Sequence, residues 1–494
     1  MNPSKNIWIN KIQHGDTVNN DFIRPGANIR IGGTVKKTKN YDVIVIGSGS
    51  GGEIVDAALS QGNTVAWVDK GPLGGTCLNV GCIPSKMMIY PADRIMEINE
   101  AEKLGIKTKI TDIDFNAIMA HMRKPISESH EHMKQGLNQP MEGFQYYKGE
   151  ASFVDEYTIE INDQLIKGKK IFIGSGARPT IPKIDGINEV DYLTNNNVFD
   201  LQQKPESLII VGGGYIAVEF AHFFSAMGTQ VTILQRGSRL MSNAEPEISD
   251  LLKTKMEKRM NIVTDFEATT VKQENNILVT GRNKSTGETK QFTAEKIMIA
   301  VGRTSNADRL HVEKTGVKLD ERGYIQVNDF LETTTKNIWA FGDATGKYMF
   351  KHVANEEALV CWQNASGDHQ HKMDYHAVPY AVFTYPQIAG VGLTEEEAKH
   401  HHDILVGRAN YTDVAKGEAM MELDGFSKAI VNKEDGTILG FHIIGPYASI
   451  LIQEVINAMA LGGQIGYIGQ GMHIHPALPE LILRTFGNLK EPTS

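Results

Sequence analysis

The chain contains few cysteines, three among 494 residues. So small a number argues against a disulfide-stabilised secreted protein and favours a reducing, cytoplasmic compartment, in which a closely spaced pair would be catalytic. Long apolar runs are lacking too: VIVIG and LIIVGGG are strand-sized, so we expect no transmembrane span and no membrane partner. There is no excess of basic residues, and the net charge of −9 argues against nucleic acid as a main partner.

The composition and the N-terminal stretch set the broad organisation. A hydrophobic content of 41% with 22% charged residues describes a globular protein of several domains. Residues 1–40 are polar and contain neither the apolar core of a signal peptide nor a CxxC pair. We therefore expect an N-terminal extension there, without a metal-delivery domain.

Two of the cysteines, Cys77 and Cys82, stand in GGTCLNVGCIPSK with four residues between them. The residues that follow have apolar positions at helical spacing, and Pro84 suits a first turn. Cys82 is then expected at a helix N-terminus, which favours a thiolate, with Lys86 one turn further on the same side. The pattern favours a redox dithiol. A structural disulfide and a zinc site are the alternatives, and zinc would need about four ligands although no second Cys/His cluster is present.

A nucleotide-binding pattern begins at Tyr41, where YDVIVIGSGSGGEIVDAALSQGNTVAWVDK predicts a strand, a glycine loop, a helix and a second strand. The glycines fit G-x-G-x-x-G, which lets a pyrophosphate approach a helix N-terminus. An acid ends the second strand, placed to accept a hydrogen bond from a ribose hydroxyl. An ordinary βαβ turn is the alternative. The residues predicted to bind this dinucleotide are Gly47, Gly49, Gly52 and Asp69.

The same unit recurs in LIIVGGGYIAVEFAHFFSAMGTQVTILQRG, which suggests a second dinucleotide. Here Gln235 replaces the acid and Arg236 follows it. A missing carboxylate removes repulsion against a 2′-phosphate and a guanidinium can pair with it, which favours NADPH over NADH. The alternative is that Arg236 is a solvated surface charge. The residues predicted to bind this cofactor are Gly212, Gly214, Ala217 and Arg236.

Three later stretches carry further signals. IMIAVGRTSNAD resembles the earlier IFIGSGARPTIP and is expected to close the second unit, with Gly302 near the cofactor. IWAFGDATG ends a strand at Gly342 and Asp343, whose carboxylate could hold a ribityl hydroxyl of a flavin or cap a helix. From about Tyr375, strand-like and helical segments alternate, which is typical of an α+β domain suited to a subunit interface.

The last informative stretch is GMHIHPALPELILRTFGNL. Glu480 lies five residues after His475, and a histidine poised by a carboxylate suits proton transfer to a departing thiol. A purely structural histidine is the alternative. His473 is the weaker candidate because no acid is placed to orient it.

Taken together, GGTCLNVGCIPSK, the two glycine fingerprints, IWAFGDATG and HPALPE resemble the flavin-dependent pyridine nucleotide–disulfide oxidoreductases, from about Tyr41 to the C-terminus. The resemblance implies an α/β fold with two Rossmann-like domains, for FAD and NAD(P), and a C-terminal α+β dimerisation domain. Gly342 and Asp343 would join the first fingerprint in holding FAD. The expected domains are 1–40 (extension), 41–183 (FAD-binding, first part), 184–315 (NAD(P)-binding), 316–374 (FAD-binding, central part) and 375–494 (dimerisation).

The resemblance also implies individual roles. Lys86 would lie near flavin N5 and pair with Glu219, and Tyr215 resembles the lid of the nicotinamide pocket. His475 and Glu480 would act on the dithiol of the other subunit, so a homodimer with a shared active site is implied. The expected catalytic set is Cys77, Cys82, Lys86, Glu219, His475 and Glu480. No metal site is expected.

The expected reaction is the NADPH-dependent reduction of a low-molecular-weight disulfide, in which Cys77 attacks the substrate. Details such as VTILQRGS and FTYPQIAGVGLT are most similar to mycothione reductase, although abundant Lys, Asn and Ile are atypical of organisms that make mycothiol. Dihydrolipoamide dehydrogenase, which acts on dihydrolipoyl groups with NAD⁺, is the alternative. Mercuric reductase is disfavoured because no cysteine pair stands near the C-terminus. A flavoprotein scaffold using the extension is the alternative from another class.

Overall fold

The computed structural model describes residues 25–31, 34–367 and 369–492, with the side chains described from Lys37 onward. The chain divides into two compact units, each assembled from three separate stretches. Unit 1 contains the described residues up to Pro84, Arg123–Arg178 and Arg303–Asp374. Unit 2 contains Ser85–Met122, Pro179–Gly302 and the described residues from Tyr375.

Unit 1 is built on a mixed sheet with the strand order β4-β3-β2-β7-β6-β5, to which β1 adds beside β2 and β18 beside β7. Strands β2, β3, β4 and β18 follow the direction of β7, whereas β6 is antiparallel to it. The central strands are buried, as in sheets covered on both faces. The strands are β1 Pro25–Ile31, β2 Thr34–Ile46, β3 Val65–Asp69, β4 Phe144–Lys148, β5 Ser152–Phe153, β6 Thr158–Ile161, β7 Gln164–Ile173 and β18 Ile338–Ala340.

The strand predicted to begin at Tyr41 begins earlier, at Thr34. Thr38 pairs with Leu165 of β7, so the end of the expected extension belongs to the sheet. The expectation for residues 1–24 lies outside the described residues.

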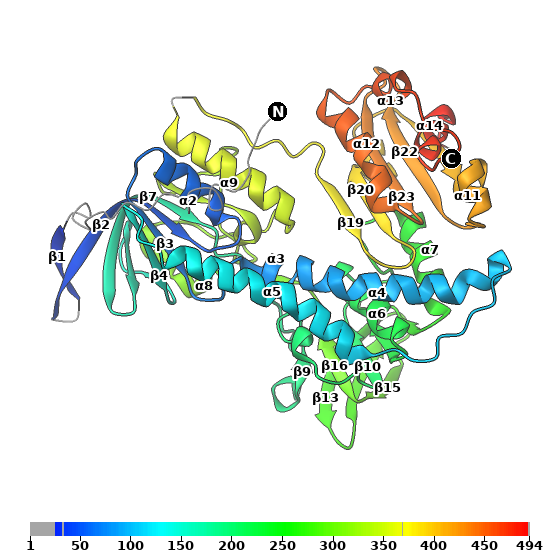
Figure 1. Cartoon of the computed structure of the whole chain (residues 1–494), viewed down its shortest axis with the longest axis horizontal. Helices are drawn as coiled ribbons and strands as arrows, with labels where there is room; N and C mark the ends of the chain where they lie inside the picture. The colour runs from blue at the N-terminus through cyan, green and yellow to red at the C-terminus, as the bar shows by residue number, and fades with distance from the viewer. Residues whose placement is uncertain (1–24, 32–33, 368, 493–494) are drawn as a thin grey trace. The chain divides into compact units, whose positions relative to one another are not determined.

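Helices α2 (Gly51–Ser60) and α9 (Lys351–Ser366) pack against each other over one face of this sheet, as Figure 1 shows. Ile54 and Val55 of α2 share an apolar cluster with Trp362 of α9 and Phe172 of β7. This packing matters for function because the glycine loop precedes α2 directly, and α9 begins at Lys351.

Unit 2 contains a parallel sheet with the order β12-β11-β10-β16-β9 and a separate antiparallel sheet with the order β13-β14-β15. Helix α6 (Tyr215–Ala226) is apolar around most of its circumference and almost wholly buried, so it lies in the core. The strands are β9 Tyr192–Leu193, β10 Ser207–Val211, β11 Gln230–Leu234, β12 Asn261–Val263, β13 Phe266–Gln273, β14 Ile277–Asn283, β15 Thr289–Ala294 and β16 Lys296–Ile299.

The C-terminal part of unit 2 is an antiparallel sheet with the order β19-β20-β23-β22-β21, packed by α12 and α14. The expected alternation of strands and helices after Tyr375 is thus present, and the mixed α/β class is confirmed. The elements are β19 Pro379–Val382, β20 Ile388–Gly392, α10 Glu395–Lys399, β21 Ile404–Asn410, α11 Ala415–Ala419, β22 Phe426–Asn432, β23 Ile438–Ile444, α12 Ala448–Ala460, α13 Gly466–Gln470 and α14 Glu480–Gly487.

Two long helices complete the fold, α4 (Cys82–Glu100) and α5 (Phe115–Leu137). The helix predicted after the cysteine pair is confirmed, and it begins at Cys82 itself. The sequence did not reveal the short helix α3 (Gly75–Val80) that carries Cys77. Within the described ranges, no helix has both the length and the apolar composition needed to cross a bilayer.

Candidate functional site

Cys77 and Cys82 lie in unit 1 as two thiols in hydrogen-bond contact, one on α3 and the other at the first position of α4. The hydrogen bond to Cys82, together with burial, raises the pKa of the Cys77 thiol, while the ammonium of Lys351 acts in the opposite direction. Cys82 is exposed, and Cys77 is partly buried. Two thiols this close share one proton when the first ionises, so they titrate as a pair.

The first glycine loop requires glycine at Gly47 and at Gly49 for two different reasons. Gly47 has φ +103°, and a Cβ there would lie 2.1 Å from the carbonyl oxygen of Gly174, so the chain itself requires glycine. A Cβ on Gly49 would meet nothing within 4 Å. Gly49 therefore leaves open space at the loop, and Gly52 lies within the first turn of α2, the arrangement that receives a pyrophosphate.

Asp69, at the end of β3, braces this loop. Its carboxylate oxygens accept the backbone N–H groups of Ser48, at 2.6 Å, and Gly71, at 2.8 Å. Each carboxylate oxygen still has a further lone pair, as a ribose hydroxyl would need.

Asp343 lies in a short 3₁₀ turn, Gly342–Ala344, just beyond β18. Its carboxylate is 3.1 Å from Nε of Arg303, and burial raises its pKa while Arg303 opposes the shift. The helix-capping alternative does not hold for α9, whose N-cap residue is Phe350. The open loop and this partly buried carboxylate fit a flavin dinucleotide, whose pyrophosphate the loop at Gly49 would receive and whose ribityl chain Asp343 would hold.

The second glycine loop, in unit 2, repeats the design of the first. A Cβ on Gly212 would lie 2.2 Å from the carbonyl oxygen of Ala300, whereas Cβ atoms on Gly214 and Gly302 would meet nothing within 4 Å. Gly214 is the N-cap of α6, Tyr215 is the first residue of that helix, and Ala217 is buried in it. The loop therefore offers a helix N-terminus beside open space, as the sequence predicted.

Gln235 and Arg236 follow β11 beside this loop. A Cβ on Gly213 would lie 2.9 Å from the Gln235 side chain, which donates to the carbonyl of Arg239 at 3.1 Å. Arg236 is exposed, and no ion pair engages it among the residues that the structure describes. Arg239 is less available than Arg236 to pair with a phosphate, because its Nε is 3.0 Å from the carboxylate of Asp250.

The ion pair expected between Lys86 and Glu219 is present in unit 2. The Lys86 ammonium is 2.7 and 2.9 Å from the two oxygens of Glu219, and it lies 4.6 Å from the ring centre of Phe383. Glu219 is buried and also accepts the N–H of Phe383 at 3.0 Å. The Glu219 carboxylate thus holds the Lys86 ammonium in place, while 35% of the lysine side chain stays exposed.

A second polar contact between α4 and α6 was not predicted from the sequence. Buried His222 places Nε2 2.8 Å from Asp93, and Arg259 approaches Nδ1 at 2.9 Å. Burial lowers the pKa of His222, against the effect of Asp93. Because Arg259 can only donate, this network assigns the proton to Nε2 of a neutral imidazole.

His475 and Glu480 form the expected pair in unit 2. Nδ1 of His475 is 2.9 Å from one carboxylate oxygen of Glu480, and the other oxygen accepts the N–H of Ala477 at 3.1 Å. The bonds to His475 and Ala477 lower the pKa of Glu480. The His475 ring is 73% exposed, so a polar atom outside the chain can reach Nε2.

The expectation that no acid orients His473 is wrong. Glu454 of α12 lies 2.8 Å from Nε2, and the carbonyl of Gly471 lies 3.1 Å from Nδ1. The partner comes from another element, 19 residues away, which spacing around HIHP could not reveal. With both nitrogens engaged and 8% exposure, His473 remains the weaker candidate for proton transfer.

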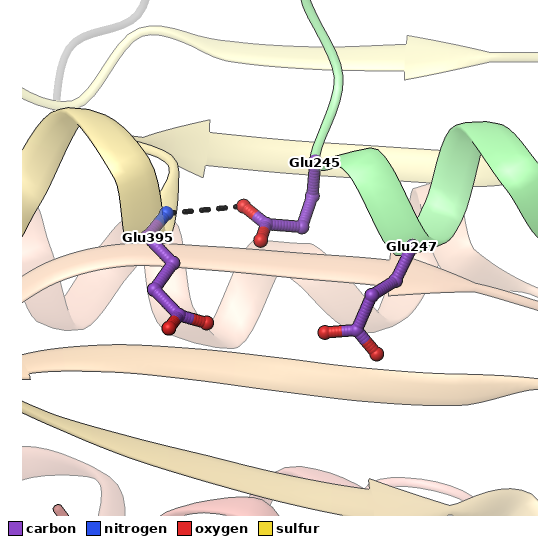
Figure 2. A group of neighbouring side chains, drawn as sticks. All are labelled: Glu245, Glu247 and Glu395. Atoms are coloured by element: carbon purple, nitrogen blue, oxygen red, sulfur yellow. Dashed lines mark hydrogen bonds between the residues drawn. The ribbon is translucent and has the colours of Figure 1, made fainter. Parts of the chain in front are cut away.

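One group of carboxylates in the described part of the chain is close enough to share a metal ion: Glu245, Glu247 and Glu395 (Figure 2). The first two come from the start of α7 (Pro246–Glu257), and Glu395 begins α10. The buried ammonium of Lys428 already contacts all three, at 2.9 Å from Glu247 and 2.6 Å from Glu395. The group is therefore an internal ion-pair cluster.

With this geometry established, similarity to known proteins identifies the class. A family model described as pyridine nucleotide-disulphide oxidoreductase matches residues 41–358, and the model of the same family's dimerisation domain matches residues 378–485. The chain belongs to the pyridine nucleotide–disulphide oxidoreductase family and is an oxidoreductase of the flavoprotein disulfide reductase type.

Several relatives are similar to the chain over most of its length. Mycothione reductase from Mycobacterium tuberculosis is 35% identical over 90% of this chain and 98% of its own length. Dihydrolipoyl dehydrogenase from Geobacillus stearothermophilus is 34% identical over 90% and 94%, and mercuric reductase from Staphylococcus aureus is 34% identical over 86% and 78%. Among solved structures, the HOCl-induced flavoprotein disulfide reductase RclA from Escherichia coli superposes with a TM-score of 0.80 at 27% identity, covering 91% of this chain and 99% of that one.

Proposed function

We propose that this protein is an FAD-dependent, NADPH-linked reductase of a low-molecular-weight disulfide, working through Cys77 and Cys82. The observation that carries the proposal is the contact between these two thiols at the start of α4, in the unit that contains the open FAD loop. A disulfide forms and breaks reversibly between sulfurs held this close.

FAD, held by the first glycine loop and Asp343, would supply the redox chemistry that links NADPH to the sulfurs. A Cys77–Cys82 disulfide would receive two electrons in this way and become two thiols. The Cys77 thiolate then attacks one sulfur of the substrate disulfide, whose S–S bond breaks as a mixed disulfide forms. The departing thiolate takes a proton from His475 of the partner subunit. Cys82 next attacks Cys77, which releases the second thiol and restores the protein disulfide. In sum, one disulfide, one NADPH and one proton give two thiols and NADP⁺.

The helix that begins at Cys82 supports the order of attack. Its free N–H groups and macrodipole stabilise a thiolate on Cys82, which keeps that sulfur reactive for the second exchange. Glu480 would hold the His475 ring so that its exposed nitrogen faces the leaving sulfur.

The preference for NADPH is supported by the end of β11. Gln235 brings no negative charge to the second glycine loop, and exposed Arg236 has no carboxylate partner within the described ranges. A guanidinium in this state can pair with a 2′-phosphate without giving up another ion pair.

The dimerisation domain supports a homodimer in which His475 of one chain serves the dithiol of the other. Large apolar side chains are exposed in this region, and a soluble monomer would leave them in water. They include Leu423, Ile450, Leu461, Met472 and Ile474.

Dihydrolipoamide dehydrogenase is the second candidate, because a dihydrolipoyl dehydrogenase is 34% identical over nearly the full length. Mercuric reductase is less well supported, because Cys361 is the only other cysteine of the sequence and lies buried in α9.

Steady-state assays with the purified flavoprotein separate these candidates. Our proposal expects a faster turnover with NADPH than with NADH when small disulfides are screened, among them the disulfides of mycothiol and glutathione. Faster oxidation of dihydrolipoamide by NAD⁺ than reduction of any small disulfide would favour the second candidate. Cys82→Ser should retain FAD and lose disulfide reduction; a variant that keeps full activity would exclude the dithiol relay.

A further inference from the structure

The segment that carries Cys77 rests directly on the first glycine loop. Gly75, the first residue of α3, has φ +62°, and a Cβ added there would lie 2.6 Å from Cα of Gly49. Nothing larger than glycine fits this contact without displacing backbone. The glycine loop and helix α3, which carries Cys77, are therefore held in a fixed position relative to each other within unit 1.

A lysine from a distant part of the chain is bound to the same loop. Lys351 is the first residue of α9, and its ammonium donates to Oγ of Ser50 at 3.0 Å and lies 3.5 Å from the carbonyl of Gly49. It also contacts the side chain of Asn355, one turn along α9, which accepts from Ser50 at 2.8 Å. These contacts hold a partly buried ammonium at the point where α2, α3 and α9 converge.

The charges around this ammonium come from each of the neighbouring elements. Burial lowers the pKa of Lys351, while the charges of Cys77 on α3, Glu53 on α2 and Cys82 on α4 favour its protonated form. The effect is reciprocal, because Lys351 favours the ionised form of Cys77 against burial and the hydrogen bond to Cys82. The sequence spacing instead pointed to Lys86 as the cation for the sulfurs. In the structure the Lys86 ammonium instead forms an ion pair with the carboxylate of Glu219, which compensates its charge.

We propose that Lys351 is the cation that stabilises the thiolate form of the Cys77–Cys82 pair, and so makes the reduced enzyme more reactive toward a disulfide. The proposal rests on the dithiol function described above and adds a residue to it. Lys351 acts through charge and position, since Ser50, Asn355 and the Gly49 carbonyl hold its ammonium in place.

The direct test is the pH dependence of thiol alkylation. The FAD-loaded dimer is reduced with one equivalent of dithionite, and the rate of reaction with iodoacetamide is followed from acid to alkaline pH, with mass spectrometry to identify the alkylated cysteine. For Lys351→Met we expect the midpoint of the rate profile to rise by about one pH unit, which corresponds to about tenfold slower alkylation below the midpoint. Lys351→Arg should keep the midpoint near that of the unaltered protein.

Two further variants separate charge from structure. Asn355→Ala removes one of the groups that hold the ammonium, and should move the midpoint in the same direction by a smaller amount. Lys372→Met removes an exposed lysine of unit 1 that pairs with Asp329 at 3.0 Å, and should leave the profile unchanged.

Three results would overturn the proposal. The first is an unchanged midpoint in a Lys351→Met variant that keeps its FAD. The second is loss of FAD from that variant with thiols that titrate as in the unaltered apoprotein, which would assign Lys351 to cofactor binding. The third is an equal shift in Lys351→Arg. A shift in Lys351→Met alone, in an enzyme that reduces no disulfide in the screen, would instead contradict the proposed function and leave the role of Lys351 intact.

Discussion

Glu219 binds the ammonium of Lys86 with both of its carboxylate oxygens, at 2.7 and 2.9 Å. One of these oxygens also accepts the N–H of Phe383, so α4, α6 and the strand end at β19 meet at a single buried carboxylate. The charge and the direction of the Lys86 ammonium are therefore both set by Glu219, as the proposed position of Lys86 beside the flavin would need.

Glu219→Gln tests this relationship. The amide keeps the shape but removes the negative charge, so the Lys86 ammonium loses its anionic partner. We expect the reduction of FAD by NADPH to slow about tenfold, equivalent to about 1.4 kcal/mol, with little change in thermal unfolding. Stopped-flow measurement of flavin bleaching checks this. Glu97→Gln, on the exposed side of α4, is the matched control, and an equal slowing there would refute the assignment.

His475→Ala should affect one half of the catalytic cycle. Removing the imidazole takes away the proposed proton donor to the leaving thiol, and general acid catalysis of this kind contributes about 10²–10⁴ in rate. Disulfide exchange should slow by that order, while flavin reduction by NADPH stays near its original rate. Rapid-mixing experiments on each half-reaction measure the two rates, with His402→Ala, an exposed histidine, as control. Equal slowing of both halves would contradict the role of His475.

Arg236→Ser tests the choice of nicotinamide. A charged hydrogen bond to a 2′-phosphate contributes about 1.5–3 kcal/mol, so the variant should lose about 10- to 100-fold in kcat/KM for NADPH. The value for NADH should hardly move, because NADH lacks that phosphate. Arg282→Ser, another exposed arginine of unit 2, should change neither value. A parallel loss with both nucleotides would show that Arg236 does not read the phosphate.

Lys428→Met should destabilise unit 2. The lysine side chain is 4% exposed and lies among three carboxylates, which would be left without a cation. Breaking such a buried cluster costs about 3–5 kcal/mol. Chemical denaturation measures the loss, and a second change, Glu245→Gln, should recover part of it because it removes one of the stranded charges. Lys433→Met, at an exposed pair, should have almost no effect; similar losses at the two lysines would show that burial is not decisive.

The buried His222 gives a prediction about pH. Its pKa in the folded protein is lowered from 6.5, chiefly by burial, so the unfolded chain binds a proton more readily. The contribution of His222 to stability is therefore complete above about pH 6.5 and is lost as the pH falls toward its folded pKa. Urea midpoints across this interval should fall less steeply for His222→Gln than for the unaltered protein. Identical slopes would mean that His222 does not titrate on unfolding.

Much of the fold and of the site could be predicted because the signals are local. The two glycine loops can be recognised because their glycines stand at fixed spacing directly after strands. The prediction that Cys82 lies at the start of a helix is confirmed. His475 and Glu480 are five residues apart, and their hydrogen bond is present. Local patterns of this kind depend on backbone geometry that a few neighbouring residues determine.

The features that the sequence did not reveal depend on contacts between distant segments. Lys351 meets the loop at Ser50 across 301 residues, and Asp93 meets His222 across 129. Glu454 reaches His473 from α12, 19 residues earlier in the chain. In each case a polar side chain finds its hydrogen-bond partner on a segment that only the packing of the fold brings near. The spacing of residues along the sequence does not predict such contacts.

The buried lysine among three glutamates has a consequence for how the protein would behave when divalent ions are scarce. The positive charge that joins α7 to β22 and α10 is covalently part of the chain, so it cannot be stripped by a chelator or exchanged for the wrong ion. The junction between the parallel sheet of unit 2 and the C-terminal sheet should therefore be unaffected by metal depletion, an advantage for an enzyme whose thiols themselves attract soft metals.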